Sequence, residues 1–538
     1  MQMQGNTHQI LLVDLIEQTN PSAIDKQRRN ASYLVCCSPP EVLQYVFDIY
    51  VNDEHKMHHQ DRDPKAVLPP TALLSHVCAR WRALCLDDKH LWAKITIDHH
   101  RGRWPPEFIA RSGNSPLEVA FGISKKYGLE VALAVVHNMH RVCSLDARGS
   151  SEHLQPFCDA LTGTAAPILE YLCLGHFPNP AMYGTAVYVP SNIFAGTAPK
   201  LRSISLANVF PQGPPVQAFA HLTDVHMDGA LTATTAQPFL QSAPDLKVMI
   251  CWKFSTHPDA NTYLPMVPSS LEGKRVDAAQ MTCLAIDDDD MAQIVQLLED
   301  VNAPSLSQIG LFNMCLTHPD LEHFTLALPL ALSFHIKALR RIHGSCRELA
   351  MDSSSITCWP SQSNLVRHDL IDDADDVFPF YAQWDYDDDS FPEEVAPFVD
   401  GMLGVLPVDE VRTLSLRYIT RNWGSLYRAS NVTVLNYTCE SPDADVLRFL
   451  QAMVPLDQRI DVAGTALDDR TLFPQLARIV FKNMMISTDS GNLVRVLQRL
   501  SRARQNDGIA LEVAFEGCSG QENITTGLED MSVTWDGA

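Results

Sequence analysis

Several patterns that mark common protein classes are missing from this chain of 538 residues. Its 14 cysteines never form C-x-x-C, so neither a zinc site nor a disulfide framework is indicated, and reduced thiols are expected. Basic residues are scarce, with 41 against 64 acidic ones and a formal net charge of -23. That balance argues against a surface that binds nucleic acid.

Motifs for catalysis, cofactors and membranes are also missing. The chain contains neither G-x-G-x-x-G nor H-E-x-x-H, and Gly517 to Gly520 does not meet the G-x-S-x-G spacing. No apolar run reaches the roughly 18 residues of a membrane span, and we expect no secretory signal. His55, His58 and His59 indicate a solvated loop rather than a metal site. We therefore expect no enzyme, cofactor, metal, nucleic acid or membrane partner.

What the chain does contain is a pair of short amphipathic helices near its beginning. Ser38 and Glu41 enclose two prolines in an S-x-x-E pattern that is typical of a helix start. The apolar residues that follow recur with a helical period and are Val42, Leu43, Val46, Phe47 and Tyr50. A second amphipathic helix is predicted from Leu73 to Cys85. Two such helices cannot bury their own apolar faces, so they need the rest of the chain or a partner.

Taken together, these residues resemble an F-box. The residues that carry the resemblance are Pro39-Pro40-Glu41-Val42-Leu43, Phe47, Val77-Cys78-x-x-Trp81-Arg82-x-Leu84 and Leu91-Trp92. The insertion between the helices resembles F-box-like proteins abundant in mushroom-forming (basidiomycete) fungi. The residues after the box are similar to the run that follows it in those proteins: Trp104, Arg111-Ser112-Gly113 and Pro116-Leu117. The resemblance covers about residues 33 to 121.

This resemblance implies a Skp-family adaptor as partner and, through it, a cullin. It implies that Phe47 and Trp81 belong to the internal core of the box. The residues it places toward the adaptor are Pro39, Pro40, Leu43, Val77, Cys78 and Trp92. Most F-boxes open with Leu-Pro, whereas Ser38 precedes Pro39 here. That departure keeps open a box that serves only as a structural cap.

A degenerate phrase, apolar-x-x-apolar-x-apolar, recurs after the box. Its instances begin at Val142, Leu169, Leu201, Leu222, Leu246, Met281, Leu306, Val411, Val432 and Leu476. Most spacings fall in or near the window of about 20 to 29 residues of leucine-rich repeats, whose signature is L-x-x-L-x-L. Each phrase predicts one short parallel strand, and segments such as 291–298 and 446–450 predict helices between strands. We therefore expect an α/β, leucine-rich-repeat-like solenoid, with an ordinary α/β domain as the alternative.

The predicted organisation has four parts. They are a flexible lead at 1–32, a helical F-box-like domain at 33–97 with an inserted loop at 52–65, a solenoid at 98–516 with an acidic insertion at about 337–410, and a polar tail at 517–538. The outward strand positions of the solenoid are predicted to bind a protein substrate, and they are Tyr171, His226, Trp252, Phe312, Arg417, Asn436 and Lys482.

The function implied is that of an F-box substrate-recognition subunit in a Skp/cullin/F-box ubiquitin ligase, in the cytoplasm, the nucleus or both. Such a subunit carries no chemistry of its own and acts by proximity. The alternatives are a leucine-rich-repeat scaffold that engages no ligase and, more distantly, an uncharacterised α/β enzyme.

Overall fold

The computed structural model describes only part of the chain, and structural statements below concern that part. The described ranges are 38–57, 69–97, 104–123, 128–176, 187–211, 216–229, 239–252, 275–287, 291–315, 321–352, 354–358, 379–385, 396–417, 424–439, 444–455, 471–486, 491–521, 524 and 527–536. The chain divides into two compact units, residues 1–222 and 223–538. Each unit is described by itself.

The first unit begins with a group of short helices. They are α4 (Pro40–Met57), α5 (Pro70–Ser75), α6 (Ala79–Asp87), the 3-10 turn η1 (His90–Trp92) and α7 (Trp104–Arg111). The predicted helix start is confirmed, since the Pro39 carbonyl accepts from the N–H groups of Val42 and Leu43. The prediction that a loop begins at residue 52 is wrong, because α4 continues to Met57.

The second predicted helix, from Leu73 to Cys85, is two helices instead of one. Cys78 has an extended backbone between α5 and α6, and its Sγ accepts from the N–H of Trp81 at 3.4 Å. Arg82 Nε donates to the Ser75 carbonyl at 3.0 Å, so a side chain replaces the helical partner there. The apolar period continues across this break, which explains why the pattern predicted one continuous helix.

A parallel sheet follows in the first unit. The elements of this part are β1 (Lys94–Ile97), β2 (Leu117–Ile123), α8 (Gly128–His137), η2 (Met139–Arg141), β3 (Val142–Gly149), α9 (Ser151–Ala160), η3 (Leu161–Gly163), β4 (Tyr171–His176), β5 (Val187–Val189), η5 (Ile193–Gly196), β6 (Ser203–Ala207), β7 (Val209–Pro211) and η6 (Gln217–Phe219). Of these strands, β5 and β7 pair only with each other, in a separate two-stranded sheet. One row of partners crosses the sheet: Ile95, Val119, Leu145, Leu172 and Ile204. Strand β1 follows η1 directly and pairs with β2, so the helical group is continuous with the sheet.

The second unit repeats this architecture. Its elements are β8 (Asp224–Asp228), β9 (Val248–Trp252), β10 (Val276–Asp277), β11 (Cys283–Asp287), α11 (Met291–Asp300), β12 (Val301–Asn302), β13 (Gln308–Cys315), α12 (Leu321–His343), β14 (Glu348–Met351), β15 (Ser355–Cys358), β16 (Phe380–Asp385), α13 (Ala396–Val405), η7 (Val408–Glu410), β17 (Thr413–Arg417), η8 (Gly424–Arg428), β18 (Val434–Thr438), α14 (Ala444–Ala452), β19 (Arg478–Lys482), α15 (Gly491–Asn506), β20 (Glu512–Glu516) and β21 (Ser532–Asp536).

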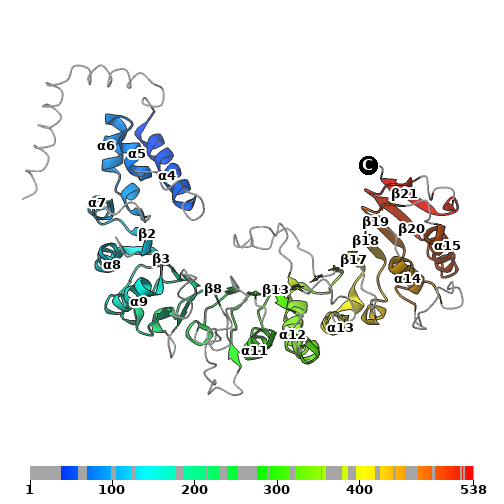
Figure 1. The fold of residues 1–538 in the computed structure, drawn as a ribbon. Helices are drawn as coiled ribbons and strands as arrows, with labels where there is room; N and C mark the ends of the chain where they lie inside the picture. Colours follow the sequence, from blue (N-terminus) through cyan, green and yellow to red (C-terminus); the bar gives the residue numbers. More distant parts are fainter. Residues whose placement is uncertain are drawn as a thin grey trace, which may run out of the picture. The chain divides into compact units, whose positions relative to one another are not determined.

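Every recurring phrase lies on a strand or leads into one. In β18, for example, Leu435 and Tyr437 are buried, whereas Asn436 between them is half-buried. The expected α/β class with a mostly parallel sheet is confirmed. Helices α8 and α9 in the first unit, and α11 to α15 in the second, lie along one side of the strands of their own unit (Figure 1). The strand faces on the helix side therefore form the core, and the opposite face, the open face below, carries the intervening residues.

Two predicted parts need correction. The segment at 337–410 is not an insertion outside the repeat pattern, because α12 ends inside it and β14, β15 and β16 join the sheet there. β15 runs antiparallel to both of its neighbours. Its four residues do not match the apolar-x-x-apolar-x-apolar phrase found on the parallel strands. The polar tail at 517–538 contains β21, which pairs in parallel with β20, with Trp535 opposite Phe515.

Basic side chains repeatedly cap the carbonyl end of a helix that lies earlier in the chain. Arg141 donates to the carbonyl oxygen of Ile109 in the last turn of α7, at 3.0 Å, and to that of Gly113 just after the helix, at 2.7 Å. The glycine of the Arg-Ser-Gly motif ends α7, since Gly113 has the left-handed φ of +57° that is common just after a helix. The same device occurs at the ends of α11, α13 and α14, and the donors are His335, Arg428 and Arg504. Such caps satisfy carbonyl groups that lack helical partners.

His335 makes stability depend on pH. Its side chain is fully buried, Nε2–H donates to the Leu298 carbonyl at 3.0 Å, and Nδ1 has no hydrogen-bond partner among the described residues. Burial first, and then the charge of Arg275, lowers the His335 pKa below 6.5. The unfolded chain therefore binds a proton before the folded one does, and stability is lost as pH falls below about 6.5. We expect His335→Gln to flatten the decline of the urea midpoint between about pH 7 and pH 5. An unchanged slope would contradict this assignment.

Candidate functional site

Helix α4 has two apolar faces. The inward face carries Leu43, Phe47 and Val51, all buried, and the Phe47 ring packs on Trp81 with centroids 4.8 Å apart. These residues are spaced at i, i+4 and i+8, so they form one line along the helix. This line packs α4 against its neighbours and forms the core of the helical group.

The opposite face of α4 is apolar and exposed. The side chains Val42, Tyr45, Val46 and Ile49 are 50, 69, 48 and 43% exposed. Their spacing of i, i+3, i+4 and i+7 is that of one helix face, which we call the outer stripe. Leu73 in α5 and Val77 after it are also exposed. Contiguous exposed apolar side chains of this kind mark interaction surfaces.

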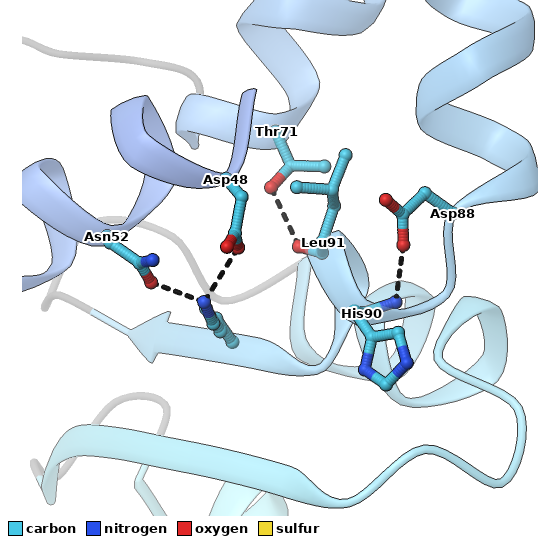
Figure 2. Close-up of polar contacts among 7 residues, drawn as sticks. Asp48, Asn52, Thr71, Asp88, His90 and Leu91 are labelled. Atoms are coloured by element: carbon cyan, nitrogen blue, oxygen red, sulfur yellow. Dashed lines mark hydrogen bonds and ion pairs between the residues drawn. The ribbon is translucent and has the colours of Figure 1, made fainter. Parts of the chain in front are cut away.

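Polar contacts fix the backbone around this stripe. Arg80 donates to the Ser38 carbonyl at 2.6 Å and ties α6 to the start of α4. Thr71 Oγ1 donates to the Leu91 carbonyl at 2.9 Å, which holds α5 against η1 (Figure 2). The Asp88 carboxylate accepts from the His90 N–H at 3.0 Å (Figure 2).

The far end of α4 is joined to the first strand of the sheet. Lys94 Nζ in β1 lies 2.9 Å from the Asp48 carboxylate and also donates to Asn52 (Figure 2). Since Asp48 and Asn52 are one helical turn apart, a single ammonium group bridges both turns. The outer stripe is therefore presented by a helix whose inner side is anchored at both ends.

The residues predicted to contact an adaptor separate into two groups. Pro39, Pro40 and Val77 are exposed, and Cys78 is half-buried as the cap of α6. Leu43 and Trp92 are buried in this chain, with only 2% and 1% of these residues exposed, and their adaptor contact stays a prediction. Both are used internally.

Trp92 is held inside the helical group by contacts from three other residues. Its Nε1–H donates to the Cys85 carbonyl at 2.5 Å, Phe108 packs on its edge at 5.0 Å, and Arg111 lies over its ring at 4.4 Å. These contacts come from residues both before and after it in the chain. Sequence reasoning missed Tyr45 and Ile49, although their helical spacing from Val42 is visible in the sequence.

The residues predicted to face a substrate all lie on strands, on the open face of the sheet. Tyr171 is on β4 of the first unit, beside an ion pair between Asp146 and Arg148 at 2.9 Å, and burial raises its pKa. In the second unit the positions are His226 on β8, Trp252 on β9, Phe312 on β13, Arg417 on β17, Asn436 on β18 and Lys482 on β19. Their role in binding stays a prediction.

Some of these positions already have partners in neighbouring strands. Lys482 Nζ lies 3.2 Å from the Glu516 carboxylate, and Asn436 donates to the Ser415 hydroxyl at 3.1 Å. Trp252 and Phe312, by contrast, come together with a residue that sequence reasoning missed, Tyr381. Tyr381 was overlooked because it lies in the segment interpreted as an insertion.

Little in the described residues points to chemistry. They contain no group of three or more His, Cys, Asp or Glu placed to hold a metal, and the side chains of His55, His58 and His59 lie outside them. Burial raises the pKa of Cys158 to about 12 and of Cys173 to about 11, so these thiols are protonated at neutral pH. None of the helices in the described ranges combines the length and apolar character needed to cross a bilayer.

Comparison with known proteins adds no family to this description. Neither a scan against protein-family models nor a search of curated proteins found a match for this chain.

Proposed function

We propose that this chain is the F-box substrate-recognition subunit of a Skp/cullin/F-box ubiquitin ligase. The observation that carries the proposal is the outer stripe of α4. A helix whose inner face already fills a core, and whose outer face is apolar at i, i+3, i+4 and i+7, is suited to lie in a groove of another protein. In this proposal the outer stripe, with Pro39, Pro40 and Val77, replaces Leu43 and Trp92 as the adaptor contact.

The sheet is the second half of the proposal. We interpret it as a leucine-rich-repeat-like solenoid, supported by the phrase that recurs on consecutive parallel strands in register. Its open face would hold a protein substrate. The ligase would then act by proximity, since a substrate bound on the same chain as the adaptor has a high effective concentration near the conjugating enzyme.

Size-exclusion chromatography with light scattering tests the proposal. The full chain is mixed with a purified Skp-family adaptor, and we expect one peak with the mass of a one-to-one complex. Separate elution of the two folded proteins at concentrations of about 10 μM, well above the dissociation constant of a stable complex, would contradict the proposal. It would favour a repeat scaffold that engages no ligase.

A further inference from the structure

We propose that the open face around Trp252, Phe312 and Tyr381 binds an arginine or lysine side chain in a basic segment of a partner protein. The inference rests on the proposed function only in calling that partner a substrate. The residues that carry it all lie in the second unit.

Strand register places acidic and aromatic side chains in one row. Asp228 on β8 pairs with Trp252 on β9, Trp252 pairs with Asp287 on β11, and Asp287 pairs with Phe312 on β13. Directly paired residues of parallel strands share a face, about 4.8 Å apart. The Asp228 and Asp287 residues therefore flank Trp252 on its two neighbouring strands.

The aromatic rings form a continuous surface. The centroids of Trp252 and Phe312 are 5.4 Å apart, and those of Phe312 and Tyr381 are 5.0 Å apart. Gly310 makes this possible, because a Cβ at that position would lie 2.6 Å from Phe312 Cε2. The Phe312 ring lies in the space that a side chain at 310 would fill, and it reaches Tyr381, the strand partner of Gly310.

The rings rest on a buried apolar base. Val248, Ile250 and Ala285 are buried, and Trp252 and Phe312 pack against them. Trp252, Phe312 and Tyr381 are themselves half-buried, so each keeps part of its surface for a partner. A ring surface fixed from below loses little conformational entropy when a ligand binds.

The negative charge of this region favours a cationic ligand. Strands β8, β9, β11, β13 and β16 contain no Lys or Arg, and His226 is their one basic residue. Burial, and then the negative charge of Asp352, raises the Tyr381 pKa, so a third carboxylate acts on the Tyr381 end of the row. A cation over an aromatic face and beside carboxylates is favoured twice, whereas an anion is repelled. The net charge of -23 also attracts a basic partner from a distance.

Fluorescence anisotropy with labelled peptides and the full chain tests this proposal. The probes are a short peptide of alternating arginine and glycine, the same peptide with citrulline for arginine, and the same peptide with glutamate. Citrulline keeps the shape of arginine and removes its charge. We expect the arginine peptide to bind about tenfold more tightly than the citrulline peptide, and the glutamate peptide not to bind.

Variants locate the site. Trp252→Ala and the isosteric Asp287→Asn should each weaken binding of the arginine peptide about fivefold or more, whereas Gln505→Ala, at an exposed position of helix α15, should not change it. Asp287→Asn keeps the test valid if Trp252→Ala fails to fold. Equal binding of the arginine and citrulline peptides, or no effect of either variant in the folded chain, overturns the proposal. The assay contains no adaptor, so its failure is separate from failure of the ligase proposal.

Discussion

Replacing Arg504 by Met is expected to lower the free energy of unfolding of the second unit by about 3 kcal/mol. Arg504 is 1% exposed and donates to the carbonyl oxygens of Met453, Leu472 and Phe473 at 3.1, 3.3 and 2.9 Å. Met fills a similar volume, but it leaves buried carbonyl groups without a donor. Each hydrogen bond to a charged group contributes about 1.5 kcal/mol or more.

The matched control for this prediction is Arg502→Met, the same substitution at an exposed position of α15. It should change the unfolding free energy by less than about 0.5 kcal/mol. Urea unfolding followed by circular dichroism measures both variants. Equal midpoints for Arg504→Met and the wild-type protein would show that the cap contributes nothing to stability.

Replacing Val46 by Asp should weaken adaptor binding by about 100-fold or more without unfolding the helical group. Val46 is half-exposed in the free chain, so a carboxylate there stays in water and costs only a few tenths of a kcal/mol in helix propensity. In the complex the same carboxylate would be buried against apolar groups without a partner, which costs several kcal/mol.

Biolayer interferometry with immobilised adaptor measures this effect. The control is Leu326→Asp, which places the same charge at a 70%-exposed apolar position of α12 and should bind like the wild-type protein. Leu43→Asp is unsuitable, because Leu43 is in the core and its loss would unfold the helices. Binding of Val46→Asp at wild-type affinity would exclude the outer stripe as the contact.

The sequence predicts the sheet well because its signal is repeated. Leu414 and Leu435, for example, occupy the same position of the apolar phrase on two neighbouring strands, where they are strand partners. Stacked units bury such residues together. β15 was missed because an antiparallel strand between parallel ones needs no such phrase. Tyr381 was missed because its strand β16, which pairs in parallel with β13, lies in the segment that was interpreted as an insertion.

The helical group was harder to predict because its apolar pattern is ambiguous. Leu43 and Val46 lie on one broad apolar arc of α4, and only the positions of α5 and α6 decide which of them is buried. The break at Cys78 depends on a side-chain cap and on Arg82, a contact between separate helices that periodicity does not contain. Tertiary packing therefore determines which face of α4 stays exposed, and this exposed face is the candidate site.

Amide hydrogen exchange of the full chain, with and without saturating Skp-family adaptor, tests the central claim most directly. Short helices exchange through local opening, which a bound partner suppresses. We expect the adaptor to slow exchange in α4 and α5 and to leave β17, β18 and β19 unchanged. Unchanged exchange in α4, with protection confined to the strands of the second unit, would contradict the claim that the outer stripe is the docking surface.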